Sequence, residues 1–154
     1  MTSFLLTVGR AALAETLNVL QAAGDCECVV LWLASSEQGV FTVKEVYRPP
    51  QRASQDYFEI PRAGMVSIMD RLRTRSLSVA AQIHTHPGRA FHSAADERWA
   101  IVRHVGALSI VIPYFARHTT AEHFFDESAV FRMDPRGQWQ EITTLEEVLV
   151  IGDR

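Results

Sequence analysis

Two histidines one residue apart stand in the stretch QIHTHPGRAFHSAADER, residues 82–98. In a β-strand alternate side chains share a face, so His84 and His86 should project the same way. Two imidazoles on one face can hold a metal ion, and catalytic zinc usually takes a third protein ligand and a water molecule. Asp96 lies ten residues after His86 and can supply that ligand if the Pro-Gly loop between them bends back.

The same residues allow a purely structural interpretation. With six histidines in 154 residues, an accidental His-x-His is not rare. Ser93 and Asp96 also match a capping box, with serine at the N-cap of a helix and an acid three residues later. The conjunction of H-x-H-P, a short loop and S-x-x-D favours a metal site, and the cap would hold Asp96 in a defined place.

A candidate base lies in another part of the chain. Glu27 belongs to CECVVLWLA, residues 26–34, which reads as a buried strand by its apolar and β-branched composition. A carboxylate in such a strand is costly unless it is paired or lies near a metal ion. Glu27 could take a proton from zinc-bound water and pass it to a leaving amine. The alternative is a glutamate at the strand end that points into solvent.

Taken together, Glu27, HTHP at 84–87 and SAAD at 93–96 resemble the motifs of the JAMM/MPN+ metalloproteases, also called JAB domains. The resemblance covers most of the chain, and the compact length is similar to minimal prokaryotic members. It implies a JAB/MPN fold of the cytidine-deaminase-like kind. The implied activity is that of a zinc-dependent, deubiquitinase-like isopeptidase or peptidase.

The resemblance implies a role for each of five residues. His84, His86 and Asp96 would bind Zn²⁺. Glu27 would be the general acid/base acting through zinc-activated water. Ser93 would donate a hydrogen bond to the oxyanion of the tetrahedral intermediate.

The implied substrate is the C-terminal tail of a ubiquitin-like protein, cleaved in deconjugation or precursor processing. Its conjugates and the enzymes of the conjugation pathway are the implied partners. An extended tail would lie beside a sheet edge by β-augmentation. The loop GRAFH, residues 88–92, and the segment 49–57 are candidates for lining the groove.

The chain departs from the family pattern in the loop before the cap. Nine residues separate His86 from Asp96, one fewer than the family usually has. The S-x-x-D spacing is intact, so the shortening falls in residues 87–92, and we expect a shorter loop with the ligand retained. His92 stands where the family usually has proline or a small residue. We interpret His92 as a loop histidine, the alternative being an additional group near the site.

Two other functions share part of this pattern. A non-catalytic MPN scaffold keeps the fold and loses the metal residues, and the complete set in this chain argues against it. A RadC-like relative also has H-x-H-P and S-x-x-D, and the sequence does not separate it from a peptidase. Metallo-β-lactamase-like sites continue as H-x-H-x-D-H, which Pro87 and Gly88 exclude.

The composition narrows the range of partners. The 154 residues fit one domain, 1–154, and 47% of them are hydrophobic. A net charge of −3 gives no reason to expect nucleic acid or anionic membrane as a partner. Cys26 and Cys28 are too close in sequence for an ordinary loop-closing disulfide, and two cysteines fall short of a zinc ribbon. We therefore expect a cytoplasmic protein.

Hydrophobic periodicity predicts a single-domain α/β fold, a mixed and mostly antiparallel sheet flanked by helices. Residues 26–48 should form an antiparallel hairpin, and 49–54 a loop. One helix face should carry Met65, Ile68, Met69 and Leu72. The end, TLEEVLVIG, is either helix or strand. The expected strands are 3–8, 26–34, 40–48, 57–60, 78–86, 107–114, 121–126 and two within 129–142 joined by a DPRG turn, and the expected helices are 10–23, 61–75 and 94–104.

Overall fold

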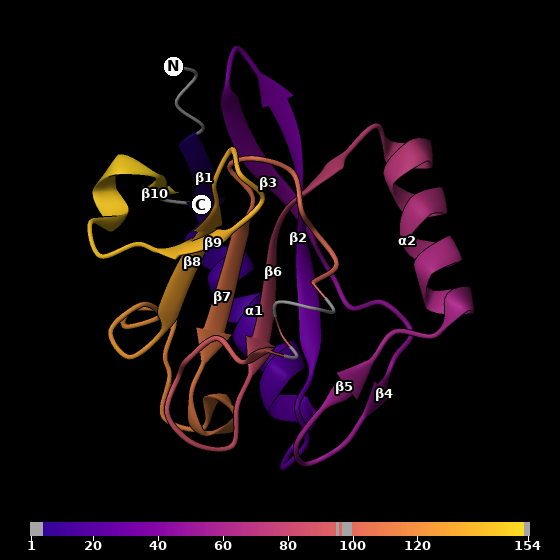
Figure 1. Ribbon diagram of the computed structural model, residues 1–154, viewed down its shortest axis with the longest axis vertical. Coiled ribbons are helices and arrows are strands. Elements are labelled where there is room, and N and C mark those ends of the chain that lie inside the picture. Colours follow the sequence, from indigo (N-terminus) through magenta and orange to yellow (C-terminus); the bar gives the residue numbers. More distant parts are fainter. Residues whose placement is uncertain (1–4, 95, 97–99, 153–154) are drawn as a thin grey trace.

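The computed structural model describes residues 5–94, 96 and 100–152. Eight strands form one sheet in the order β10-β1-β3-β2-β6-β7-β8-β9, and two more form a small separate hairpin (Figure 1). The large sheet comprises β1 (Leu5–Gly9), β2 (Val29–Glu37), β3 (Val40–Tyr47), β6 (Ser78–Thr85), β7 (Leu108–Ile112), β8 (Ala129–Met133), β9 (Trp139–Glu141) and β10 (Leu149–Gly152). The hairpin comprises β4 (Arg52–Ala53) and β5 (Phe58–Glu59).

The pairing within the sheet is mixed. Strand β2 pairs antiparallel with both β3 and β6, and β8 pairs antiparallel with both β7 and β9. Strand β1 pairs parallel with β10 and β3, and β6 pairs parallel with β7. This arrangement confirms the predicted α/β class with a mostly antiparallel sheet, including the hairpin within residues 26–48.

The two faces of the sheet carry different helices, α1 (Arg10–Ala22) and α2 (Arg62–Arg75). Side chains of β2 alternate between them: Val30 and Trp32 share a core cluster with α1, whereas Leu31 and Leu33 share one with α2. Helix α1 lies behind the sheet in Figure 1, and α2 lies to its right. Neither helix in the described part of the chain is long and apolar enough to cross a membrane.

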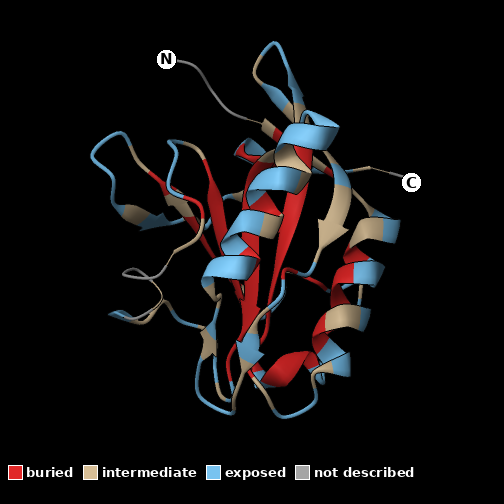
Figure 2. Cartoon of the chain, turned by 90° about the vertical axis from the view of Figure 1, so that its right-hand side faces the viewer, coloured by how far each residue is buried: buried red, intermediate tan, exposed pale blue. Residues whose placement is uncertain are grey.

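Helix α2 has a narrower buried stripe than the sequence predicts. Ile68 is 2% exposed, but Met69 is 63% exposed, so the predicted apolar face is wrong in part. The cause is the close approach at Gly64, where an added Cβ would lie 2.4 Å from the carbonyl oxygen of Pro50. With this contact, the helix face that carries Gly64 and Ile68 packs toward the sheet, and Met65 and Met69 face the solvent. Figure 2, in which α2 faces the viewer, shows most of this helix as exposed or intermediate.

Three predicted elements differ from the structure. Residues 49–54, predicted as a loop, contain β4. Residues 121–126 form turns and not a strand, because Phe124 is buried beside Trp32 and its neighbour Phe125 packs against the same cluster. In a strand, successive side chains would point to opposite faces.

The predicted helix 94–104 is wrong at its end. Residues 100–104 are not helical, and the backbone amides of Ile101 and Val102 donate to the side chain of Gln82. Residues 95 and 97–99 lie outside the described part. The undecided C-terminal segment contains both a short 3₁₀ turn, Leu145–Glu147, and the strand β10.

The two neighbouring residues of α2 provide a test of this packing. Ile68→Ala should lower the free energy of unfolding by about 2–4 kcal/mol, because it leaves a cavity between helix and sheet. Met69→Ala is the matched control and should change it by less than about 0.5 kcal/mol. Urea denaturation followed by circular dichroism measures both, and equal losses would contradict the observed orientation of α2.

Candidate metal centre

His84 and His86 lie at the end of β6, on the sheet face that also carries α2. Both are buried, and their ring centroids are 5.1 Å apart. His84 pairs with Val29 of β2 on one side and Val111 of β7 on the other, so β6 is central in the sheet. The predicted shared orientation of the two imidazoles is confirmed.

Asp96 reaches both histidines. Its Oδ1 lies 3.2 Å from His84 Nε2, and its Oδ2 lies 3.1 Å from His86 Nε2. The Asp96 side chain is 7% exposed. One potential ligand atom from each of the three residues can be chosen so that all lie within 4.8 Å of one another. The structure therefore brings together the three residues that the sequence proposed as ligands.

The unsatisfied nitrogens of His84 fit a metal ion. Its contact with Asp96 does not meet the geometry of a hydrogen bond, and both ring nitrogens lack a hydrogen-bond partner among the described residues. Buried polar atoms normally have partners, so an orphaned imidazole nitrogen that faces a second imidazole and a carboxylate needs an explanation. Two imidazoles and one carboxylate form a donor set that suits zinc and related divalent ions.

The capping box that the sequence predicts is present. The backbone N–H of Ser93 donates to Asp96 Oδ2 at 2.8 Å, and the backbone N–H of Asp96 donates to Ser93 Oγ at 3.1 Å. Burial raises the pKa of Asp96, but the two imidazoles and the Ser93 N–H together lower it further, so the pKa lies well below its usual range. The carboxylate is therefore anionic and competent as a ligand.

Glu27 lies just before β2, which begins at Val29 and not at residue 26 as predicted. The Thr85 N–H donates to the Cys28 carbonyl at 3.2 Å, which continues the pairing of Val29 with His84 by one residue. One further step in this register places Glu27 opposite His86. Cys28 belongs to the core cluster of α1, so Glu27 takes the opposite face, that of the metal centre. Its exposed fraction is 7%.

The environment of Glu27 makes its carboxyl group a proton acceptor near neutral pH. Burial is the largest effect and raises its pKa from 4.5 to about 7; His86 opposes the rise, and Asp96 and Asp56 add to it. A group with a pKa near the working pH can both accept and release a proton. The pKa values of the two carboxyl groups thus shift in opposite directions, because both imidazoles act strongly on Asp96 whereas burial dominates at Glu27.

Backbone contacts on both sides hold these groups in place. The Glu27 N–H donates to the Ser54 carbonyl at 2.6 Å. The Gln51 side chain behaves like a strand partner of Val29, accepting from its N–H at 2.9 Å and donating to its carbonyl at 2.8 Å. Gln51 could not be found from the sequence, because a single side-chain amide that takes the place of a neighbouring strand leaves no periodic pattern.

A left-handed turn supports His86 from the other side. Three successive non-glycine residues, Tyr114, Phe115 and Ala116, have φ values of 55°, 53° and 61°. This conformation is unfavourable for L-residues. The Phe115 N–H donates to the His86 carbonyl at 2.9 Å, and the Tyr114 N–H donates to the Gly88 carbonyl at 3.0 Å. The turn thereby fixes the backbone where the second histidine leaves β6.

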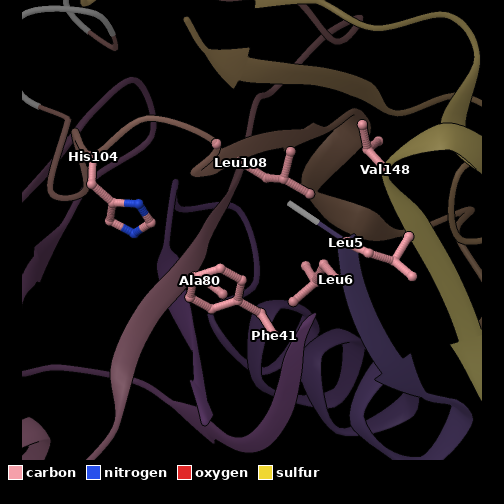
Figure 3. A pocket seen from close by; sticks show the side chains of 8 residues that line it. Leu5, Leu6, Phe41, Ala80, His104, Leu108 and Val148 are labelled. Atoms are coloured by element: carbon pink, nitrogen blue, oxygen red, sulfur yellow. The ribbon is translucent and has the colours of Figure 1, made fainter. Parts of the chain in front are cut away.

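A small pocket elsewhere on the sheet lacks comparable chemistry. Figure 3 shows this pocket around Ala80, near the start of β6. His84 and His86 lie at the other end of that strand. Its lining side chains are aliphatic or aromatic except for His104, whose Nε2 lies 2.7 Å from the Val79 carbonyl oxygen. The metal centre, and not this pocket, carries the reactive groups.

Comparison with known proteins agrees with this site. Over 121 residues the chain is 34% identical to the "Probable metalloprotease y4jG" of Sinorhizobium fredii (strain NBRC 101917 / NGR234), and the match covers 75% of this chain and 72% of that protein. The chain belongs to this metalloprotease family. Membership of the metalloprotease family and the buried His-His-Asp cluster together support a metal-dependent peptidase. No protein-family model matches the chain.

Two solved structures share the fold. Protein DSY2949 from Desulfitobacterium hafniense superimposes with a TM-score of 0.69 at 17% identity, covering 97% of this chain and 94% of that one. A protein from Salinibacter ruber superimposes with a TM-score of 0.59 at 15% identity, covering 96% and 92%. At these identities the likeness concerns the fold alone.

The donor set predicts the outcome of metal titration. Asp96→Asn and His84→Gln should each weaken Zn²⁺ binding by at least about 100-fold, because each removes one of three ligands. Glu27→Gln should bind Zn²⁺ like the unaltered protein. Competition with a chromophoric chelator measures all three, with His123→Gln, an exposed histidine, as control. Unchanged affinity in the Asp96 and His84 variants would refute the site.

The raised pKa of Glu27 predicts a pH effect on stability. In metal-free protein the folded state holds the Glu27 proton more tightly than the unfolded state, so this contribution is present below about pH 4.5 and is lost as the pH rises through about 7. The free energy of unfolding should fall relative to Glu27→Gln across this window, by up to about 3 kcal/mol.

Urea denaturation at pH 5 and pH 8 with a chelator present measures this difference. Glu59→Gln removes an exposed carboxylate on β5 and is the matched control. A difference between wild type and Glu27→Gln that is the same at both pH values would contradict the assignment.

Proposed function

We propose that the protein is a JAMM-type zinc peptidase or isopeptidase that cleaves after the C-terminal tail of a ubiquitin-like protein. The observation that carries the proposal is the buried set of His84, His86 and Asp96 with the carboxyl group of Glu27 near enough for His86 and Asp96 to act on its pKa. Three ligands and an adjacent base of pKa about 7 are the groups that metal-assisted amide hydrolysis requires.

The residues divide the chemistry between them. Zinc, when bound, supplies Lewis-acid polarisation of the scissile carbonyl and lowers the pKa of a water molecule. His84, His86 and Asp96 would hold the ion. The Glu27 carboxylate takes the proton of the attacking water and gives it to the nitrogen of the leaving amine as the C–N bond breaks.

Ser93 is suited to stabilise the oxyanion. Its Oγ accepts a hydrogen bond from the Asp96 N–H, so the position of the hydroxyl is fixed while its own proton stays available for donation. A preorganised donor at a developing negative charge contributes several kcal/mol to catalysis.

Features beside the centre support an extended substrate. Phe91 in the GRAFH loop is 46% exposed, and its ring packs edge-on against His86 at 4.6 Å. On the other side, Ser54 and Tyr57 belong to the β4–β5 hairpin, whose Ser54 carbonyl accepts from Glu27. Both segments that the sequence suggested as groove walls therefore contact residues of the centre. The choice of a ubiquitin-like tail itself rests on the motif resemblance.

A fusion of a ubiquitin-like protein to a reporter tests the proposal. Zinc-loaded protein should release the reporter after the tail, a chelator should stop release, and added Zn²⁺ should restore it. Glu27→Gln should lower kcat/KM by about 10²–10⁴-fold and Ser93→Ala by about 10²–10³-fold, with zinc still bound. The rates are measured by gel densitometry or reporter fluorescence.

Two controls separate the parts of the proposal. The same tail on an unrelated folded protein shows whether the ubiquitin-like body is recognised, and equal cleavage of both would refute a ubiquitin-like substrate. Absence of cleavage of any tail by zinc-loaded protein would refute the peptidase.

A further inference from the structure

His92 directly precedes Ser93, and its ring lies beside the metal centre, with its centroid 6.4 Å from that of His84. Its ring stacks on Phe131 of β8, with centroids 4.6 Å apart and an interplanar angle of 27°, and meets the ring of Trp139 of β9 edge-on at 5.6 Å. Its Nε2 lies 3.1 Å from the Oγ of Ser109 in β7. The loop that joins the metal ligands is therefore tied to three strands at this one side chain.

The contact continues into β6. The Gln82 Nε2 donates to Ser109 Oγ at 3.1 Å, and the two residues are register partners in β6 and β7. The Gln82 Oε1 accepts from the N–H groups of Ile101 and Val102, at 2.8 Å and 3.3 Å. Both Gln82 and Ser109 are buried. Since Ser109 Oγ accepts from Gln82, its own O–H can be donated to His92.

This chain of hydrogen bonds connects the two parts of the metal centre. Gln82 lies two residues before His84, so both side chains project from the same face of β6. At the other end, His92 is bonded through the backbone to Ser93, whose capping box orients the Asp96 carboxylate. The histidines at the end of β6 and the aspartate that follows the loop are thus joined by hydrogen bonds of residues outside the proposed ligand set.

We propose that His92 is a positioning residue, which through Ser109 and Gln82 fixes Ser93 and Asp96 relative to His84 and His86 and so sets the metal affinity of the centre. The proposal rests on the proposed metal site. Groups that orient ligands without touching the metal commonly change affinity by about 10–100-fold.

The need for such an anchor follows from the loop itself. Between His86 and His92 the loop has few buried side chains, since Gly88 has none, Arg89 and Phe91 are exposed, and Ala90 is only half-buried against β7 and β8. Without the His92 contacts, metal binding would have to order this loop, and the ordering cost would appear as weaker binding.

Metal affinity in a double-mutant cycle tests the proposal without an activity assay. His92→Phe keeps the ring packing and removes the hydrogen bond, whereas Ser109→Ala removes the partner. Each should weaken Zn²⁺ binding by about 10-fold, and the double variant should be no weaker than the worse single variant. His92→Gln retains a side-chain amide able to reach Ser109 and should stay within about threefold of wild type.

Competition with a chromophoric chelator gives the affinities, and thermal unfolding of the metal-free variants gives their stability. His123→Phe, at an exposed turn, is the matched control. If the Ser109 variant fails to fold, the contrast between His92→Phe and His92→Gln decides the question.

The outcomes separate this inference from the proposed function. Wild type that binds no Zn²⁺ would refute the metal site itself. Wild type that binds Zn²⁺ while the His92 and Ser109 variants bind equally well, or lose affinity additively, would refute the positioning role and leave the metal site standing. Variants that lose thermal stability but keep their affinity would show that His92 serves the fold alone, which also overturns the proposal.

Discussion

The carboxylate of Asp96 is a negative charge held out of water, and the arrangement around it follows from that constraint. A buried charge is costly unless it is paired and hydrogen-bonded. The imidazole of His84 in β6, that of His86 just after this strand and a backbone amide of its own capping box surround it. The chain can bring these groups together because β6 and β7 are parallel neighbours. A parallel pair requires a connection that crosses the face of the sheet, and this connection carries Asp96 over the histidines.

The antiparallel neighbour of β6 completes the centre. Because β2 runs opposite to β6, its beginning lies beside the end of β6, and Glu27 arrives across from His86. One burial environment then yields two different carboxyl groups. Asp96, surrounded by donors, stays ionised, whereas Glu27, with mainly desolvation acting on it, holds a proton up to about pH 7. The difference in charge state between the proposed ligand and the proposed base thus comes from strand direction and local contacts.

Local sequence patterns predicted the residues of this centre, but they could not predict polar contacts between residues far apart in the sequence. Alternation in β6 was enough to put His84 and His86 on one face, and a capping box is recognisable within four residues. Asp96 could be proposed as a metal ligand only because the paired histidines and the capping box occur together. Gln82 could not be assigned in this way, because it accepts hydrogen bonds from the backbone of Ile101 and Val102, 19 and 20 residues later in the sequence. The exposed methionines of α2 have a similar cause, since the close approach of Gly64 to Pro50, a contact between distant segments, favours the observed rotation of that helix.

The position of β1 has a consequence for how the molecule assembles. This strand lies between β3 and β10, and its residues 6–9 pair with 149–152. Pairing residues so far apart in sequence closes a very long loop, and because this costs chain entropy we expect the β1–β10 pair to form late in folding. Every residue of the proposed metal centre lies between Glu27 and Asp96, and the strands that carry and flank it, β2, β6 and β7, all precede β10 in the sequence. The residues of the proposed centre can therefore come together first, while one edge of β1 stays open to other strands until β10 pairs with it.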